Sequence, residues 1–148
     1  MTQDVSISVK GLQAVAGTSD KETVEVINIG HLSEINQKTY ISYEEVIEGE
    51  QKPVRNLFKI SDDCIELVRK GGLATNMIFK KNEKTISYYE TPFGSLNLGI
   101  FATRVEVNRK GAYIDVLTEY SLEVNGEHIS NCLVEIAVRP LEDGVELA

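Results

Sequence analysis

Four polar residues, Arg69, Thr103, Thr118 and Tyr120, stand where an alternating pattern predicts side chains that face an apolar interior. A guanidinium group binds a carboxylate through two parallel hydrogen bonds, and the hydroxyls add further donors and acceptors. Burying a hydroxyl costs about 1–3 kcal/mol unless it is hydrogen-bonded, so each group needs a partner. The pattern predicts a converging interior site for the polar end of a small ligand. The alternative is a structural network in which Arg69 closes one end of the barrel by pairing with an acidic side chain such as Glu66 or Glu90, and the hydroxyls hydrogen-bond to one another.

Tyr43 and Glu45 form a second candidate pair for the same interior. Because Glu44 and Glu45 are adjacent on an expected strand, their side chains point to opposite faces and cannot act together as acid and base. If Tyr43 and Glu45 face inward, Glu45 would balance the charge of Arg69. The alternative is that both carboxylates are solvated at an edge of the sheet.

No residue of this sequence stands in a recognisable catalytic or metal-binding motif. His31 and His128 have no further ligand at standard spacing, and no serine lies in a nucleophile elbow. Cys64 and Cys132 are expected to be reduced thiols, with a single disulfide as the alternative. The sequence therefore predicts a protein that is not an enzyme and that has no catalytic residue, no metal and no cofactor.

Composition limits the classes of partner. The 148 residues carry a formal net charge of -8, which opposes binding to nucleic acid and to anionic membranes. No segment approaches the roughly 20 apolar residues of a membrane span, and residues 1–6 lack the features of a secretion signal. These features predict a cytoplasmic protein without nucleic-acid or membrane partners.

Period-two alternation of apolar and polar residues recurs along the chain and predicts strands. The expected strands are residues 4–10, 23–29, 40–46, 54–60, 64–69, 73–79, 85–90, 95–108, 112–124 and 128–138. Only residues 30–38 suit a helix, and a short one. Such a long antiparallel sheet tends to curl, so we predict an all-β, up-and-down closed barrel of about 8–10 strands, with a two-sheet sandwich as alternative. We expect one domain over residues 1–148, with the barrel core at about 4–139 and a tail at 140–148.

Turns and irregularities can also be placed. Asn125-Gly126 predicts a tight hairpin, and tight turns are expected at residues 71–72 and 92–94. The alternation slips at Val26 and Ile27, which indicates a bulge or a strand buried on both faces. A further bulge is expected at Gly99 and Ile100, where it would bend a long strand around the barrel.

Several phrases in a fixed order resemble the YwiB-like family of small bacterial barrel proteins. The similarity spans nearly the whole chain, and it rests on Tyr40-x-x-Tyr43-Glu44-Glu45, Arg69-x-Gly71, Met77-x-Phe79, Tyr89-x-Thr91-Pro92-Phe93-Gly94, Leu98-Gly99-x-x-x-Thr103, Tyr120-x-Leu122-x-x-Asn125-Gly126 and Asn131. The resemblance implies a calycin-like, lipocalin-like barrel in a cytoplasmic bacterial setting, and a domain of unknown function.

Two functional hypotheses follow. The first is a module that binds a small apolar or amphipathic ligand, with a carboxylate as one option for its polar end; the candidate residues are Arg69, Thr103, Thr118, Tyr120, Tyr43 and Glu45. The second is a structural or interaction protein with a filled barrel, acting as a monomer or homodimer through a surface that includes Leu117, Ile129 and Leu133.

Overall fold

The computed structural model describes residues 2–15, 21–46, 53–70, 75–91 and 94–141. The strands are β1 (Thr2–Val15), β2 (Lys21–Ile35), β3 (Lys38–Glu45), β4 (Val54–Ile60), β5 (Cys64–Lys70), β6 (Thr75–Lys80), β7 (Lys84–Thr91), β8 (Gly94–Lys110), β9 (Tyr113–Val124) and β10 (Glu127–Pro140). The described residues contain no helix, hence none long and apolar enough to cross a membrane. The turns expected at residues 71–72 and 92–93 lie outside the described residues.

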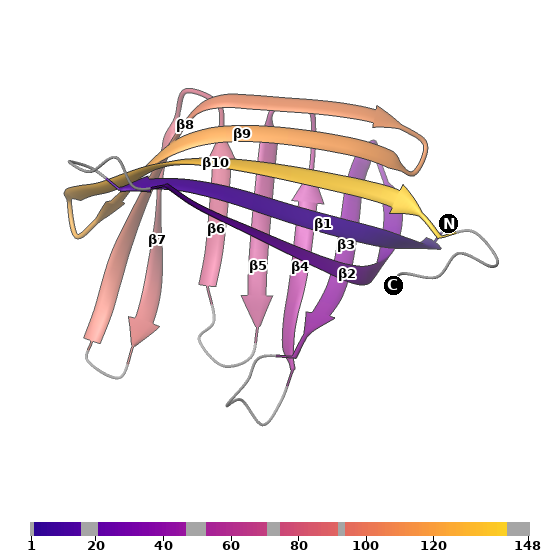
Figure 1. Cartoon of the computed structure of the whole chain (residues 1–148), viewed down its shortest axis with the longest axis horizontal. Coiled ribbons are helices and arrows are strands. Elements are labelled where there is room, and N and C mark those ends of the chain that lie inside the picture. The colour runs from indigo at the N-terminus through magenta and orange to yellow at the C-terminus, as the bar shows by residue number, and fades with distance from the viewer. Residues whose placement is uncertain (1, 16–20, 47–52, 71–74, 92–93, 142–148) are drawn as a thin grey trace.

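The ten strands form one antiparallel sheet in the order β6-β5-β4-β3-β2-β1-β10-β9-β8-β7. The sheet curls into a nearly closed barrel, in which β8, β9, β10 and β1 cross over the more upright β4 to β7 (Figure 1). Strands adjacent in sequence pair with each other, as an up-and-down arrangement requires, except β6 and β7, which are the two ends of the sheet; β1 also pairs with β10. The predicted all-β antiparallel barrel is confirmed.

Side-chain hydroxyls bridge the seam between β6 and β7, and a backbone hydrogen bond ties the turn between these strands to β8. Thr85 Oγ1 donates to the carbonyl oxygen of Ile78 at 2.6 Å, and the Ser87 hydroxyl donates to the carbonyl of Asn76. The backbone N–H of Asn82 donates to the carbonyl of Ala102 at 2.8 Å. Hydroxyls on the inner face of β7 thus satisfy carbonyls of the edge strand β6, which a free edge would leave exposed.

The helix expected at residues 30–38 is absent. β2 continues through Ile35, and a two-residue turn at Asn36 and Gln37 leads straight into β3. Both turn residues have positive φ, 51° and 68°, as a hairpin turn with the twist of the flanking strands requires. Glutamine rarely adopts this conformation, and glycine is the usual residue at such a position. Because Gln37 stands there, the sequence does not reveal the turn.

A bulge at Thr103 sets the phase of β8. Ala102 pairs with Tyr120 and Arg104 with Glu119, which leaves Thr103 as the extra residue. The register through Gly99 is continuous with both neighbouring strands, so the bulge predicted there is wrong. The extra residue turns Thr103 outward, where it is exposed, and the prediction of an inward Thr103 is wrong for this reason.

The inner face of the barrel has two halves that differ in burial. The solid half consists of side chains that are 0–1% exposed, including Ile7, Ile41, Ile60, Ile65, Ile114 and Val138. The open half includes inner-face apolar side chains that are only partly buried, among them Val9, Leu67, Met77, Tyr120, Leu122 and Val134; Val107 and Ala112, near the solid end, are also partly buried. The change occurs along single strands: on β9, Ile114 is buried and Leu122 is partly exposed. Packing is therefore looser around these partly exposed side chains, although Ile100, which pairs with Leu122, is fully buried.

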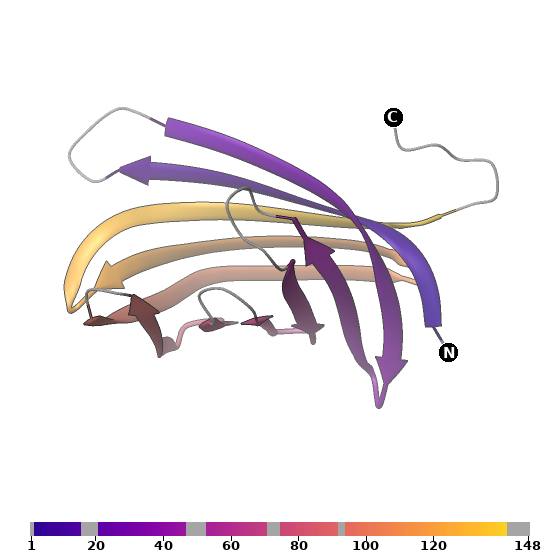
Figure 2. The ribbon, with the colours of Figure 1, turned by 90° about the horizontal axis from the view of Figure 1, so that it is seen from below.

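β2 leaves its neighbour β3 part-way along its length. It pairs with β3 only from His31 to Ile35, and residues 21–30 pair only with β1 among the described residues. In Figure 2 the violet ribbon of β2 lies beside β3 only near their shared turn. Ile27 and Ile29 lie on the outer face here and are each 56% exposed. The register of β2 past Val26 is regular, and Val26 and Ile27 are both exposed. Neither a bulge nor burial on both faces therefore explains the break in the alternating pattern at these residues.

Candidate functional site

Three inward-facing polar side chains form a row across adjacent strands at the open half. Tyr43 on β3 pairs with Asn56 on β4, and Asn56 pairs with Arg69 on β5. Glu45 follows Tyr43 on the same face of β3, because alternate residues of a strand share a face. Farther inside the barrel the same strand faces continue with apolar residues such as Phe58. The row therefore lies where the core ends.

Glu45 joins the other two polar groups through a single carboxylate oxygen. Asn56 Nδ2 donates to Glu45 Oε1 at 2.8 Å, and Arg69 Nη2 lies 3.7 Å from the same oxygen. Glu66 pairs instead with Lys59 at 3.7 Å, so it is not the partner of Arg69. The Glu45–Asn56–Arg69 cluster thus balances one positive and one negative charge at the rim of the open half.

Two buried polar atoms of this cluster have no hydrogen-bond partner among the described residues. They are Asn56 Oδ1 and Arg69 Nε. Asn56 is only 2% exposed, and a buried polar atom without a partner costs about 1–3 kcal/mol. Native structures leave few such atoms, and each calls for an explanation such as a bound molecule. The cluster is therefore the best candidate for a binding site in the described part of the chain.

A groove lies beside the cluster, between β2 and β3. It has a volume of about 370 Å³ and is lined by outward-facing residues such as Ile29 and His31 and also by Tyr43 and Asn56. The groove lies where the pairing of β2 with β3 has ended, and its lining includes two residues of the inner row. His31 is held at its outer end by Asp4, with Nδ1 and Oδ1 2.6 Å apart.

Tyr120 lies at the boundary between the two halves. Its ring packs edge-on against Phe79, with 4.8 Å between the ring centroids, and thereby joins β9 to β6 across the interior. Cys132 lies opposite it on β10, and the Ser130 hydroxyl lies 3.5 Å from the Cys132 sulfur. Cys132 and Cys64 are both free thiols. Burial first, and Cys132 second, raise the pKa of Tyr120, which therefore stays neutral.

The structure separates the residues that the sequence grouped together. Arg69, Tyr43 and Glu45 lie together at the rim, whereas Tyr120 lies deeper against Phe79. Thr118 is buried and pairs with Val105 and Val134, and Thr103 lies on the outer face of the barrel. The four residues expected to converge therefore do not form one site.

Asn56 is the member of the cluster that sequence reasoning missed. It lies between Val54 and Phe58 in the inward phase of β4, where all three are buried. A polar residue in an apolar phase was the signal that singled out Thr118 and Tyr120, and the same signal is present at Asn56.

A family model described as a domain of unknown function, DUF1934, matches residues 7–136 of the chain. The chain belongs to the DUF1934 family. A curated relative, the uncharacterized beta-barrel protein YwiB of Bacillus subtilis (strain 168), is 22% identical over 136 residues, or 90% of this chain and 94% of the relative. The crystal structure of the ywiB protein from Bacillus subtilis matches with a TM-score of 0.75 and 20% identity over 92% of both chains. The resemblance seen in the sequence is confirmed, and the structural match shows the fold alone.

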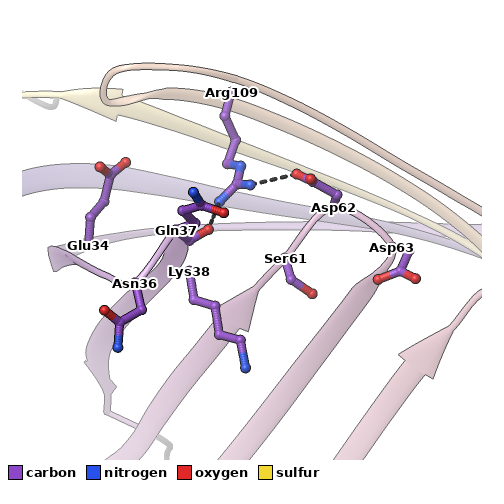
Figure 3. Close-up of a pocket in the computed structure, with 8 residues that line it drawn as sticks. All are labelled: Glu34, Asn36, Gln37, Lys38, Ser61, Asp62, Asp63 and Arg109. Carbon is purple, nitrogen blue, oxygen red and sulfur yellow. Dashed lines mark hydrogen bonds and ion pairs between the residues drawn. The ribbon is translucent and has the colours of Figure 1, made fainter.

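A second pocket of this DUF1934 chain lies at the solid end and is structural. It has a volume of about 500 Å³ and lies between the turns that follow β2 and β4. Figure 3 shows Arg109 reaching across it from β8 toward Asp62 and Gln37. Its guanidinium donates to Gln37 O and Thr39 Oγ1 at 3.1 Å each, and to Asp62 Oδ1 at 2.6 Å. Arg109 thus ties the β8–β9 hairpin to two other hairpins, and sequence reasoning missed it because its partners are 47 to 72 residues away.

The ionisation of Tyr43 in this DUF1934 protein provides a test of the cluster. Burial, then the charge of Glu45, raise the pKa of Tyr43 to about 12, with Arg69 acting in the opposite sense. Because the pKa of Tyr43 is higher in the folded state than in the unfolded chain, the neutral phenol favours the folded state. This contribution to the free energy of unfolding is complete below pH 10 and is lost as the pH rises toward 12. A near-ultraviolet titration should show a late-ionising phenol that disappears in Tyr43→Phe. Loss of a phenol that ionises near its ordinary pKa of 10.0 in that variant would place Tyr43 in solvent and contradict the geometry.

Proposed function

We propose that this protein binds a small, partly apolar molecule in the open half of its barrel, with the polar end of the molecule at the Glu45–Asn56–Arg69 cluster. The observation that carries the proposal is the change in burial along the inner face. Apolar side chains that are 0–1% exposed in the solid half give way to partly exposed ones in the open half. Apolar side chains inside a barrel that remain open to solvent are typical of ligand sites in barrel mouths.

The chemistry of the open half suits one amphipathic ligand. Leu67 and Met77 pair with each other across β5 and β6, and Arg69 lies two residues beyond Leu67 on the same face. A ligand tail that covers these side chains would gain roughly 25 cal/mol for each Å² of apolar area removed from water. Barrels of this width can hold one small molecule beside their packed side chains.

The test uses the absence of tryptophan from the chain. Leu67→Trp places a large side chain in the open half and should weaken binding of the apolar dye N-phenyl-1-naphthylamine by at least about tenfold, or 1.4 kcal/mol. Ile86→Trp on the exposed outer face of β7 is the matched control and should bind the dye as the native chain does. Equal binding by both variants, or none by the native chain, would overturn the proposal.

A second candidate is self-association through the edge of β2. Residues 21–30 have no second strand partner among the described residues, and Ile27 and Ile29 are exposed on this segment. An unpaired edge with apolar side chains is a template for pairing with another chain. This segment suits the role better than the expected surface, since Leu117 and Leu133 are partly buried and Ile129 alone is exposed. Light scattering that gives the mass of two chains supports this candidate, and a monomer at all concentrations excludes it.

A further inference from the structure

We infer that the polar end of the ligand is a neutral group that donates and accepts hydrogen bonds side by side, of the primary-amide class, and not a carboxylate. The inference rests on the proposed function and concerns the same site. It follows from the charges of the Glu45–Asn56–Arg69 cluster and from the two buried atoms of that cluster that lack partners.

The charge of Arg69 is already balanced. Glu45 lies 3.7 Å from Arg69 Nη2 and accepts from Asn56 at 2.8 Å, so a carboxylate entering the cluster would meet the negative charge of Glu45 at close range. Two carboxylates in one partly buried site repel each other unless one takes up a proton. Because the charges of Glu45 and Arg69 cancel, the cluster favours a ligand whose polar end is neutral.

The orientation of the Asn56 amide is fixed by Glu45. An ionised carboxylate only accepts hydrogen bonds, so the amide must turn its NH₂ group toward Glu45 and its oxygen away. Asn56 Oδ1 is then an acceptor without a partner, and Arg69 Nε is a donor without a partner. The two residues pair in register on neighbouring strands, so the acceptor and the donor belong to neighbouring side chains of the inner face.

A primary amide complements this pair. Its N–H donates to Asn56 Oδ1 while its carbonyl oxygen accepts from Arg69 Nε–H, and neither contact brings a negative charge toward Glu45. A carboxylate offers an acceptor to Arg69 Nε but sets an anionic oxygen against Asn56 Oδ1, and that buried acceptor stays unsatisfied. The groove between β2 and β3, which Asn56 lines, provides the route of approach.

The experiment compares two ligands with the same tail. Octanamide and octanoate are titrated against the full chain loaded with N-phenyl-1-naphthylamine at neutral pH, and each apparent Kd is measured by displacement of the dye. We expect octanamide to bind at least about tenfold more tightly than octanoate. Equal or tighter binding of octanoate would overturn the amide inference and leave the proposed function standing. Failure of the native chain to bind the dye, octanamide and octanoate would overturn both.

Two substitutions in the cluster separate its charge from its hydrogen bonds. Glu45→Gln removes the negative charge and should shift the preference toward octanoate by at least about tenfold, because Arg69 then has no counter-charge. Arg69→Lys keeps the positive charge but removes Nε–H, and should abolish the preference for the amide even if Glu45→Gln fails to fold. Arg104→Lys on β8, whose side chain is exposed and pairs with Glu106, is the control and should retain the native preference. Unchanged selectivity in both cluster variants would contradict the inference.

Discussion

Arg109→Ala should lower the free energy of unfolding by about 3 kcal/mol, the largest effect that we expect from a single side chain of this protein. Arg109 is 22% exposed and donates to Gln37 O, Thr39 Oγ1 and Asp62 Oδ1. Thr39 is fully buried, so removing the guanidinium takes away a hydrogen-bond partner of a hydroxyl that water does not reach. Urea unfolding monitored by circular dichroism measures the change.

Arg104→Ala is the matched control for this prediction. Arg104 lies on the same strand and makes two ion pairs, with Glu106 at 2.9 Å and Glu119 at 3.4 Å, but it is exposed. Exposed ion pairs contribute little to stability, so this variant should unfold close to the native midpoint. Similar midpoints for the two variants would contradict the role given to Arg109.

Gly30→Ala should destabilise the protein by about 2 kcal/mol, because a β-carbon at this position has no room. It would lie 2.7 Å from the carbonyl oxygen of Ser42 and 3.3 Å from Cβ of Tyr43. The carbonyl oxygen is part of the backbone of β3 and cannot rotate aside as a flexible side chain can. Gly30 is buried at the position where the pairing of β2 with β3 ends. A β-carbon there would strain the backbone beside the groove between these strands.

Gly11→Ala provides the comparison on the neighbouring strand. A β-carbon at Gly11 has nothing within 4 Å, so the variant should match or slightly exceed native stability, since alanine restricts the unfolded chain. Thermal unfolding of the two alanine variants, followed side by side, gives the difference. If Gly30→Ala were as stable as Gly11→Ala, β2 and β3 would have to lie farther apart than described.

The alternating pattern was sufficient to predict most of the barrel. It gives the inward phase of β9, where Ile114 and Val116 are buried, and the Asn125-Gly126 turn, whose residues have φ of 51° and 84°. The wrong predictions concern a turn and a bulge whose residue types do not reveal them. Gln37 adopts a positive φ without being glycine, and Thr103 is a bulge residue in an otherwise regular run. The extra residue shifts the alternation between Ala102 and Arg104, so counting back from the buried Val105 placed Thr103 inside, which is wrong.

The candidate site was predicted in part, because its members come from separate strands. The sequence left open whether Glu45 faces inward and pairs with Arg69. Only the register of β3, β4 and β5 brings Glu45 Oε1 to 3.7 Å from Arg69 Nη2. The boundary between solid and open halves could not be predicted at all. It depends on where β2 leaves β3 and on the contact of Phe79 with Tyr120, which joins strands distant in sequence.

The central claim is that the open half of the barrel is the binding compartment, and methyl NMR tests it most directly. In protein with labelled Ile, Leu, Val and Met methyl groups, saturating octanamide should shift the signals of Leu67, Met77, Leu122 and Val134. The signals of Ile7, Ile60 and Ile114 in the solid half should stay in place, since these side chains are fully buried and contact no ligand. Shifts confined to outer-face residues such as Ile27 and Ile86, or no shifts at saturation, would contradict the account.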